Sequence, residues 1–564
     1  ARLSDAELSA VVESSVAAHV MEERDGHLWF AHALYRASLY RDLPLPVRRD
    51  LHRRIAETLG RGSMPDADMV GHHFHQAGDP RAAMWLVRAG DRARRMYAWL
   101  AAAERYEMAL LADAAATEPT IDRGWLLYQT SLLWRYADLA RAMAYLEEAL
   151  EIAIQAGDRT LEIGVRYHRG LFLTWTGQVR RGLAELRLSI DAMETLDDRD
   201  YRRLNAIELF GDRRSHEHRG TLIGCLASAG YYNDAIHLGE RDLDVPRSDS
   251  MTWPSGATSS AYADGFLGLA DVYANLGDPE KASRAHERAR QAYRQIDHHH
   301  QIGWSYLDEL VGVMIPYRTD DLGARTWIAE EGVRAWERSS ETVPLPYPEL
   351  GRLPLLHLEG RWDEARRVAE GARSAGLASE ITVPILATLA QDAGDDGTFW
   401  SLVHERLPAG HLTEPGDTVF PSATHLQRLA VALHLRRGEF ERATNWLTAH
   451  DRWMEWSGAV RGQADRWLLH ARYTSAVGDA TAALRHASQA LEIAQYPRQP
   501  LAMIAAHRFL GRFLTARSSR LAREHLEESL ALAQTCQAPF EIAATLAVLA
   551  TAHAAADDRS AAEN

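Results

Sequence analysis

Residues 266–289 read FLGLADVYANLGDPEKASRAHERA. In the first half of this stretch, Leu269 and Tyr273 are four residues apart, which is the spacing of neighbours on one face of a helix. The pair Gly277-Asp278 follows. It suits a helix boundary, because glycine reaches the left-handed conformation that closes one helix and aspartate can cap the next. The stretch therefore predicts two amphipathic helices joined by a tight turn.

The second helix of this hairpin carries a side-chain pattern that recurs along the chain. A small residue is followed after four positions by a residue that is usually larger, and after three more positions by another small one. Small residues at this spacing let two helices approach closely, and the residue between them fills the groove. The pattern occurs at Ala102, Tyr106, Ala109; Ala142, Leu146, Ala149; Gly182, Leu186, Ser189; Ala282, His286, Ala289; Ala365, Ala369, Ala372; and Ala522, Leu526, Ser529.

The offsets of the tetratricopeptide pattern are matched at Leu269, Tyr273, Gly277, Ala282 and Ala289. From about residue 66 to about residue 550 the chain therefore resembles tetratricopeptide-repeat proteins. The resemblance implies an all-α fold: a tetratricopeptide-like α-solenoid in which helix hairpins stack into a right-handed superhelix. The first repeats are about 40 residues long, which exceeds the standard length of roughly 34.

The first 60 residues follow a different pattern. Ser4 and Glu7 have the spacing of a helix-capping box, and Asp25-Gly26 lies between two short apolar runs as a hairpin turn would. Two helices are expected after the hairpin. We therefore predict a winged-helix remnant at residues 1–60 and a superhelical sensor domain at residues 61–560.

A second resemblance concerns the passage between these two parts. The sequences FAHALYR (30–36), LHRRIA (51–56) and GHHFHQAGD (71–79) resemble the junction in large bacterial signal-transducing ATPases, the STAND class. There a winged helix is followed by a tetratricopeptide sensor, as in MalT-like, LuxR-type transcription regulators. The resemblance implies an ATPase domain before Ala1 and a DNA-binding domain after Asn564. ATP is then a ligand of the missing upstream domain, and no cofactor is expected in this chain.

Bulk composition limits the partners. The net charge of −15 repels a nucleic-acid backbone, so we expect no direct nucleic-acid contact. No apolar run reaches the length of about 18 residues that a membrane span needs, which argues against a membrane partner. Cys225 and Cys536 are far apart and lie in apolar helical stretches, which does not resemble a disulfide framework. This cysteine usage fits a reducing compartment, so we expect a cytoplasmic protein. Because the chain begins at Ala1 without a methionine, we expect it to be part of a longer protein.

The sequence offers no candidate for catalysis. The one lysine, Lys281, lacks the glycines of a phosphate-binding loop, and no Gly-x-Ser-x-Gly motif is present. We therefore predict no catalytic residue, and an enzyme in this chain is not expected.

Three histidine groups suggest metal binding, but each has a simpler interpretation. His72, His73 and His75 fall within the resemblance to the ATPase junction, which predicts helix packing. The run 298–300 is expected to form a solvated loop, because adjacent side chains point apart on regular backbone. In the His216-Glu217-His218 stretch the two histidines are two residues apart, whereas a zinc-protease helix spaces them by four. We predict no metal site.

A helical-repeat superhelix binds ligands on its concave face, which the first helix of each hairpin lines. Transferring the inward-facing positions of tetratricopeptide repeats gives the candidate ligand-binding residues Trp134, Arg135, Tyr167, Trp175, Asp271 and Asn275. The alternatives are a core role for the two tryptophans and solvated surface for Arg135, Asp271 and Asn275.

Three segments are longer than a compact repeat requires: 244–260, 341–354 and 408–422. Each is expected to join the second helix of one hairpin to the first helix of the next, at the same edge of the solenoid. Long loops in compact arrays are often functional, so they form either a rim over the concave face or inert insertions.

Together these observations predict the sensor arm of a signal-transducing ATPase and transcription regulator. A small-molecule inducer or a protein partner would bind the concave face, and binding would change the contact with the chain's own ATPase domain and promote self-association. The alternatives are a stand-alone protein-interaction scaffold and the regulatory arm of a nucleotide cyclase.

Overall fold

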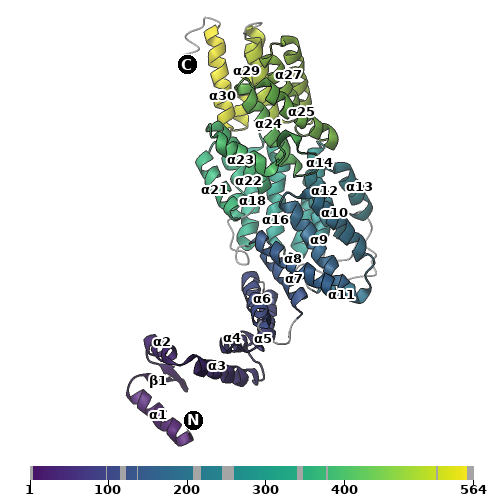
Figure 1. The fold of residues 1–564 in the computed structure, drawn as a ribbon. Helices are drawn as coiled ribbons and strands as arrows, with labels where there is room; N and C mark the ends of the chain where they lie inside the picture. Colours follow the sequence, from purple (N-terminus) through teal and green to yellow (C-terminus); the bar gives the residue numbers. More distant parts are fainter. Residues whose placement is uncertain are drawn as a thin grey trace. The chain divides into compact units, whose positions relative to one another are not determined.

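The computed structural model describes residues 4–96, 98–114, 122–135, 137–206, 218–243, 260–339, 347–375, 379–515 and 519–555. The chain divides into two compact units, Ala1–Leu133 and Trp134–Asn564, which are described separately (Figure 1). The predicted module boundary at residue 60 lies inside the first unit, and it stays a prediction.

Unit 1 begins with the predicted helix and hairpin, at α1 (Asp5–Ala17), β1 (Met21–Arg24) and β2 (His27–Phe30). The Ser4 hydroxyl accepts from the Glu7 amide at 3.4 Å and the Ser4 amide donates to the Glu7 carboxylate at 2.7 Å, so the predicted capping box is confirmed. Asp25 and Gly26 both have positive φ, 51° and 72°, as a tight two-residue hairpin turn requires. Helices α2 (Ala33–Asp42) and α3 (Leu45–Gly60) follow. The winged-helix assignment itself stays a prediction.

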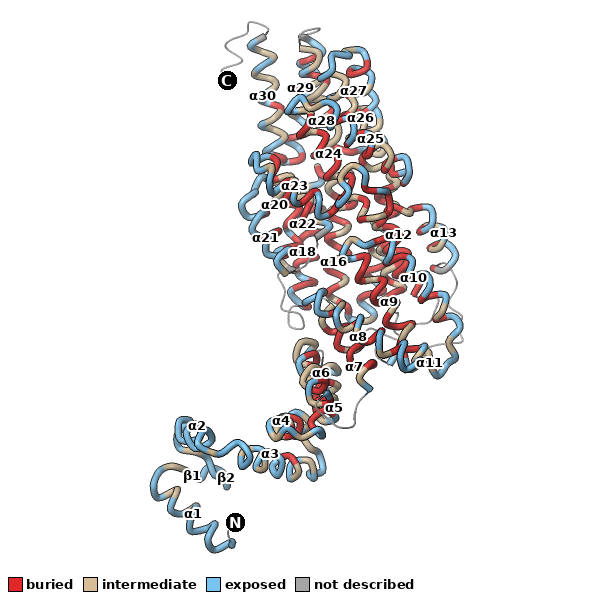
Figure 2. Tube along the Cα trace, in the orientation of Figure 1, coloured by how far each residue is buried: buried red, intermediate tan, exposed pale blue. Residues whose placement is uncertain are grey.

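These first elements bury very little of their apolar surface. Among described residues 4–60, Ala56 alone is buried (Figure 2). The exposed large apolar side chains there are Leu8, Val11, Leu28, Trp29, Leu34, Tyr35, Leu39, Tyr40, Leu45, Val47, Leu51, Ile55 and Leu59. Soluble proteins seldom leave so dense a set of apolar side chains in water.

The rest of unit 1 is helical and better packed. It comprises α4 (Ala67–Ala77), α5 (Ala82–Arg95), α6 (Trp99–Ala114) and α7 (Arg123–Trp134), and successive helices from α3 to α6 pack against each other. Gly90 of α5 lies directly against the Tyr106 ring of α6, and a side chain at Gly90 would overlap that ring. The close approach follows from the small-residue spacing predicted for this helix.

Unit 2 is an array of helix hairpins, and its described residues contain no strand. Its elements are α8 (Leu139–Ala156), α9 (Arg159–Trp175), α10 (Val179–Met193), α11 (Asp198–Asn205), α12 (His218–Ala229), α13 (Tyr232–Leu243), α14 (Ser260–Asn275), α15 (Pro279–Gln295), α16 (His299–Glu309), the π-helix η1 (Leu310–Met314), α17 (Ile315–Tyr317), α18 (Leu322–Ser339), α19 (Tyr347–Leu350), α20 (Leu353–Leu358), α21 (Trp362–Ser374), α22 (Ser379–Asp392), α23 (Asp396–Arg406), the 3₁₀ turn η2 (Gly410–Leu412), α24 (Phe420–Arg436), α25 (Phe440–Ser457), α26 (Gln463–Ala476), α27 (Ala480–Gln495), α28 (Pro500–Leu514), α29 (Ser519–Thr535) and α30 (Pro539–Ala555).

The hairpin turns form as the sequence predicts. Gly157, Gly277 and Gly478 have φ values of 67°, 84° and 90°. Asp278 accepts from the Lys281 amide at 2.9 Å, and equivalent caps begin α8, α9, α23 and α27. The small-residue pattern is buried in every helix that carries it. The structure thus confirms the predicted all-α, tetratricopeptide-like solenoid of helix hairpins.

Hairpins far apart in sequence also contact each other within unit 2. The carbonyl oxygen of Asn275, at the end of α14, accepts from the amides of Val460 and Arg461 at 2.8 and 3.0 Å. The Arg325 guanidinium donates to the Cys536 carbonyl at 2.7 Å, a contact between residues 211 apart in the chain. Arg461, in the loop before α26, likewise donates to the Val311 carbonyl of η1 at 3.1 Å, and α17 contacts α28. Turns of the first half of the array are therefore anchored on loops of the second half.

Candidate ligand-binding surface

The predicted residues Asp271 and Asn275 lie together on α14. The Asn275 side-chain amide donates to the Asp271 carboxylate and to its carbonyl oxygen, each at 2.9 Å. Burial raises the pKa of Asp271, and the charge of Arg461 and the Asn275 hydrogen bond oppose that rise. Asn275 is itself buried, so its part is to orient Asp271 and to hold the loop that carries Arg461.

The other four predicted residues lie elsewhere in the array. Trp134 is half-buried, and the Arg141 guanidinium lies 4.2 Å from the centre of its ring. Arg135 lies near His300, whose pKa falls to about 3 because of burial and, to a lesser degree, the Arg135 charge. The structure does not bring these residues to the pair on α14.

Tyr167 and Trp175 have different environments, although both lie on α9. Tyr167 is fully buried, with edge-on ring contacts to His168 and His218 at centroid distances of 5.0 Å, so it exposes no surface to a ligand. Trp175 is 37% exposed and stacks on Phe172 at 5.2 Å. Trp175 therefore remains the accessible aromatic candidate on this helix.

Asp271 interacts with two charged residues that the sequence did not suggest, Arg461 and Asp308, and further charged residues lie on the first helices of later hairpins. We call them the inner surface: Asp271, Asp308, His425, Arg428, Arg461 and Arg472. They come mainly from the first helices of hairpins, and their charges act on one another or on the shared neighbour Asp465. Arg472 is six residues before Gly478, as Asp271 is before Gly277. Comparing repeat positions could have found it.

The inner surface has an acidic and a basic part. Burial raises the pKa of Asp308 well above its usual range, and the negative charges of Asp271 and Glu380 raise it further. On the basic part, burial lowers the pKa of Arg428 and of Arg472. An arginine nevertheless keeps its charge in proteins, so the basic part holds positive charge, and water still reaches it because Arg472 is exposed and the Arg428 side chain is 25% exposed.

His425 is a neutral member of this surface. The Thr388 hydroxyl donates to the Pro384 carbonyl at 2.9 Å, so the His425 Nε2–H donates to that hydroxyl at 3.0 Å. The His425 Nδ1 then accepts from Arg428 at 3.4 Å. Burial, together with the nearby charges of Arg428, His357 and Arg461, lowers the pKa of His425 to about 3. The imidazole therefore orients Arg428 without adding charge.

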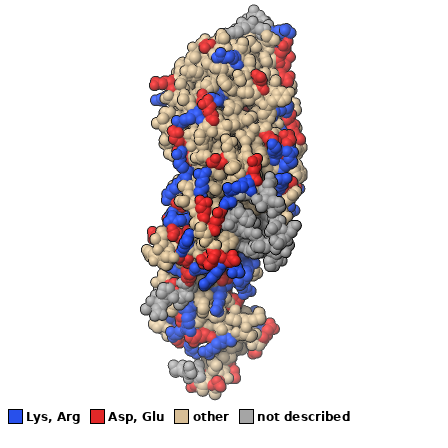
Figure 3. Space-filling view, turned by 90° about the vertical axis from the view of Figure 1, so that its right-hand side faces the viewer, with Lys and Arg blue, Asp and Glu red and all other residues tan. Residues whose placement is uncertain are grey.

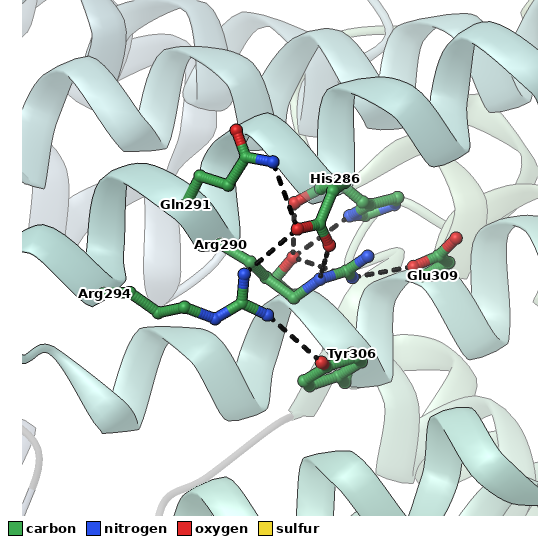
Figure 4. Close-up of polar contacts among 8 residues, drawn as sticks. His286, Arg290, Gln291, Arg294, Tyr306 and Glu309 are labelled. Carbon is green, nitrogen blue, oxygen red and sulfur yellow. Dashed lines mark hydrogen bonds and ion pairs between the residues drawn. The ribbon is translucent and has the colours of Figure 1, made fainter.

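A separate buried network fixes α15 to α16 (Figure 4). The Arg290 guanidinium donates to the Glu309 carboxylate at 2.7 Å, and these side chains are 4% and 6% exposed. Arg290 also reaches Glu287 at 3.2 Å and lies 4.3 Å from the centre of the Tyr306 ring. Arg290 and Glu309 are buried and paired with each other, and Glu287, which is 44% exposed, closes the network on its outer side, so these residues hold the two helices together.

The histidine groups take up packing positions. His72 and His73 lie against His52 of α3, with 2.7 Å between the Nδ1 atoms of His52 and His73, as helix packing predicts. The expected solvated loop at residues 298–300 is wrong: His298 and His300 are 3% and 5% exposed, because α16 begins at His299 and turns its first residues into the core.

His218 is buried at the start of α12, and residues 216–217 lie outside the described part. In the described residues no group of three or more His, Cys, Asp or Glu side chains could hold a metal ion.

Two shallow grooves on unit 2 lie away from the predicted residues. One, of about 250 Å³, is lined by residues of α13, α14 and α15, which include Phe266, Leu269 and Lys281. The other, of about 340 Å³, is lined from α21, α22 and α23. Neither groove contains a residue of the inner surface.

Of the three long segments, 408–422 lies wholly in the described part. It joins α23 to α24, the second helix of one hairpin to the first of the next, as predicted. Arg180 donates to the Pro415 carbonyl at 3.3 Å and pairs with Asp417 at 2.8 Å, so the segment is fastened to the start of α10. Residues 244–259 and 341–346 of the other two lie outside the described residues. A rim over a ligand stays a prediction.

The outer surface is mixed in charge. Figure 3 shows acidic and basic side chains interspersed over the face in view. Many of them form exposed ion pairs, such as Arg352 with Glu330 at 3.0 Å. None of the described helices is both long and apolar enough to cross a membrane.

No protein-family model and no curated protein matches the sequence. Among solved structures, the chain is similar to a chain of the APC/C hetero-tetramer Cut9–Hcn1, with 15% identity and a TM-score of 0.45 over 96% of this chain and 99% of that one. It is also similar to yeast Tom70, with 14% identity and a TM-score of 0.29 over 85% and 96%. Both TM-scores are low, so the fold assignment rests on this chain's own hairpins and turns.

Proposed function

We propose that the chain is an interaction scaffold that binds a partner protein and catalyses no reaction. The observation that carries this proposal is the apolar surface of residues 5–60. Helices α2 and α3 expose Leu34, Leu39 and Leu51 by 70%, 52% and 38%, and Ala56 is the only residue they bury among those described. Covering such side chains is favourable by about 25 cal/mol per Å² of apolar surface, which a docked protein would supply.

Aromatic side chains on this surface suit the centre of a protein interface. Trp29 on the hairpin is 58% exposed, and Tyr35 and Tyr40 on α2 are 47% and 41% exposed. Tryptophan and tyrosine dominate the binding energy of many interfaces, because each combines a large apolar area with a polar group. These three side chains are therefore the expected anchors of the partner.

A finer reading makes the chain the sensor arm of a signal-transducing ATPase. It is favoured by the order of elements in unit 1, where helix, hairpin and two helices precede the helical array, as the resemblance to that class implies. The partner of the apolar surface is then the ATPase domain of the same protein. A ligand on the inner surface of unit 2 would favour one of two states of that contact. If the chain is instead the regulatory arm of a nucleotide cyclase, the domain attached to it would be a cyclase and not an ATPase-linked transcription regulator.

Photo-crosslinking from the apolar surface tests the scaffold proposal. Amine crosslinkers are unsuitable, because the chain has one lysine, Lys281. Trp29 is replaced by benzoylphenylalanine, and crosslinked partners are identified in cells by mass spectrometry. The expected result is a defined partner domain whose crosslink is lost when Leu34, Leu39 and Leu51 are changed to serine.

The matched control changes three exposed leucines of unit 2, Leu188, Leu521 and Leu546, to serine. Crosslinking should persist in this variant. A crosslink that survives the Leu34, Leu39 and Leu51 changes, or that both variants lose equally, would contradict the proposal. If the captured domain contains a phosphate-binding loop and its crosslink yield differs between ATP and ADP, the sensor-arm reading gains support.

A further inference from the structure

We propose that the groove lined by α13, α14 and α15 binds an acidic segment of a partner protein. The segment places a large apolar side chain in the groove and its carboxylates against Arg284 and Arg288. This groove belongs to unit 2, whereas the apolar surface of residues 5–60 belongs to unit 1. The inference therefore goes beyond the proposed function by adding a second interaction surface with its own ligand chemistry.

The groove uses the face of α14 opposite to the inner surface. Leu269 and Tyr273 belong to its lining, and Asp271 and Asn275 alternate with them along the helix. Residues two apart on an α-helix point about 200° apart, so the two pairs lie on opposite faces. A Cβ atom at Gly239 of α13 would lie 2.7 Å from a Leu269 methyl carbon, so the two helices approach closely beside the groove. The groove is therefore a site separate from the inner surface.

The lining of the groove is mainly apolar, with contributions from Leu243, Phe266, Leu269 and Ala285. Its volume of about 250 Å³ is below the roughly 300–1,000 Å³ of pockets that enclose small-molecule ligands. Phe266 and Leu269 are 8% and 7% exposed, so the groove offers contact to one inserted side chain and not to a broad apolar face. Such a groove suits a single apolar anchor on a partner segment, with further affinity supplied from its border.

Three cations border this apolar lining. The Arg288 guanidinium carbon lies 5.7 Å from the centre of the Phe266 ring, and the Lys281 Nζ lies 5.6 Å from the centre of the Tyr273 ring. Arg284, between the two cations on α15, also belongs to the lining. An apolar centre with cations at its border is complementary to a segment in which Asp or Glu flanks a large apolar residue.

Two of these cations have no carboxylate partner among the described residues. Lys281 pairs with Asp278 at 3.1 Å. Neither Arg284 nor Arg288 forms a hydrogen bond or an ion pair with a described residue, and both side chains are exposed. A guanidinium that faces water without a partner can bind a carboxylate of another protein in a two-pronged geometry without first breaking an internal bond.

Nearby carboxylates leave the groove slightly positive. Glu280 and Glu287 of α15 pair with other arginines, and Lys281 and Asp278 neutralise each other. Glu240 is the acidic residue of the lining, so one positive charge remains in a chain whose net charge is −15. A single excess charge is too little to hold a nucleic-acid backbone against that net charge, whereas it suits a short acidic segment.

Selection from a library of short random peptides displayed on phage tests the groove, with the full chain as bait. We expect the enriched peptides to carry a large apolar residue flanked by Asp or Glu. The best peptide is synthesised, and its affinity is measured by fluorescence anisotropy. That affinity should fall at least tenfold when the carboxylates are replaced by amides or the apolar residue by serine, and it should fall at high salt.

A double variant assigns the binding to the groove. Arg284→Gln with Arg288→Gln should weaken the peptide at least fivefold. Because both side chains are exposed and unpaired, the variant should keep its helical circular dichroism and its melting temperature. The matched control is Arg520→Gln with Arg523→Gln, two exposed arginines of α29, and it should leave the affinity unchanged.

Lys281 provides a second readout, because it is the only lysine of the chain and lines the groove. Its side chain is 56% exposed, so an amine-reactive acetylating reagent should modify it readily in the free chain and more slowly when the peptide is bound. Peptide mass spectrometry measures both rates.

Four outcomes would overturn the proposal: slow acetylation of Lys281 in the free chain, which would mean that the groove is already covered; equal acetylation with and without the peptide; equal affinity in the double variant; or enrichment of peptides that lack acidic residues. Binding of single-stranded DNA without any enriched peptide would also overturn it. The crosslinking result at α2 is independent of these outcomes, so the scaffold proposal keeps its own test.

Discussion

Arg290 and Glu309 show how one pair of side chains can fasten two helices. Their charges lie in the protein interior at 2.7 Å, and desolvating them costs several kcal/mol, which only a well-bonded pair offsets. Removing one partner leaves the other charged and buried. The pair therefore has to be kept or replaced as a unit.

For this pair we expect Glu309→Ala to lower the free energy of unfolding of unit 2 by about 2–4 kcal/mol. That is somewhat below the usual cost, because Glu287 still pairs with Arg290. The double change Arg290→Met with Glu309→Leu should cost much less than the single change. Urea denaturation followed by circular dichroism measures both, and a double variant at least as unstable as Glu309→Ala would contradict this account.

Buried histidines make stability depend on pH. Burial is the main cause that lowers the pKa of both His300 and His450 to about 3, whereas an unfolded histidine titrates near 6.5. Between these values the unfolded state binds more protons, so stability is complete above about pH 6.5 and falls as the pH drops. Each such histidine contributes about 1.4 kcal/mol per pH unit in that range.

We therefore expect the melting temperature to fall from about pH 6.5 downward, before the carboxylates titrate. His450 is fully buried near Gln427, so His450→Gln should make the fall shallower, whatever its effect at neutral pH. Thermal unfolding at several pH values measures the slope. Equal slopes in the two proteins would show that His450 is not responsible.

At the scale of elements, hairpins depend on glycines where helices cross. Gly303 of α16 lies against the Trp336 indole of α18, and a methyl group there would overlap the ring. Gly371 of α21 has no heavy atom within 4 Å of the place where a methyl group would lie. Replacing glycine by alanine should therefore have opposite effects on stability at the two positions.

We expect Gly303→Ala to destabilise unit 2 by about 1–3 kcal/mol through overpacking. Gly371→Ala should stabilise it by about 0.5–1 kcal/mol, because alanine loses less backbone entropy in a helix. Denaturant midpoints of the two variants decide the matter. Destabilisation of similar size at both sites would mean that helix crossing does not set the effect.

The sequence alone predicted those features of each element that depend on residues adjacent in the chain, such as caps and turns. The capping box at Ser4, the Asp25-Gly26 turn and the Asp278 cap are all local, and all three are confirmed. The expectation for residues 298–300 failed because burial of His298 and His300 depends on how α16 packs, which adjacent residues do not report.

The candidate site shows the same limit. Asp271 could be placed by its repeat position, and Arg472 could have been placed in the same way. Arg461 could not, because its neighbours Asn275 and Val311 are distant in sequence, the second by 150 residues. Such contacts depend on the curvature of the array, which accumulates over many hairpins and has no local pattern in the sequence.

At the scale of the whole molecule, contacts between distant hairpin turns decide how unit 2 encloses its inner surface. Arg325 with Cys536 and Arg498 with Asp320 join the α17–α18 turn to the loops at either end of α28 and α29. These contacts hold the middle of the array against its C-terminal hairpins. Without them the hairpins of unit 2 would be free to separate there.

An engineered disulfide tests this closure most directly. A Cβ atom at Gly360 would lie 3.8 Å from the Cβ atom of Pro539, a separation that suits a disulfide. In a Cys536→Ala background, which removes the nearby thiol, Gly360→Cys with Pro539→Cys is oxidised mildly and mapped by peptide mass spectrometry. Gly394→Cys with Pro539→Cys is the control, because Gly394 has nearly the same φ, 73° against 74°, and no neighbour within 4 Å.

Closure predicts rapid and nearly complete crosslinking of the 360–539 pair and none of the 394–539 pair. A free dithiol at 360 and 539, in a chain that keeps its helical circular dichroism, would contradict it.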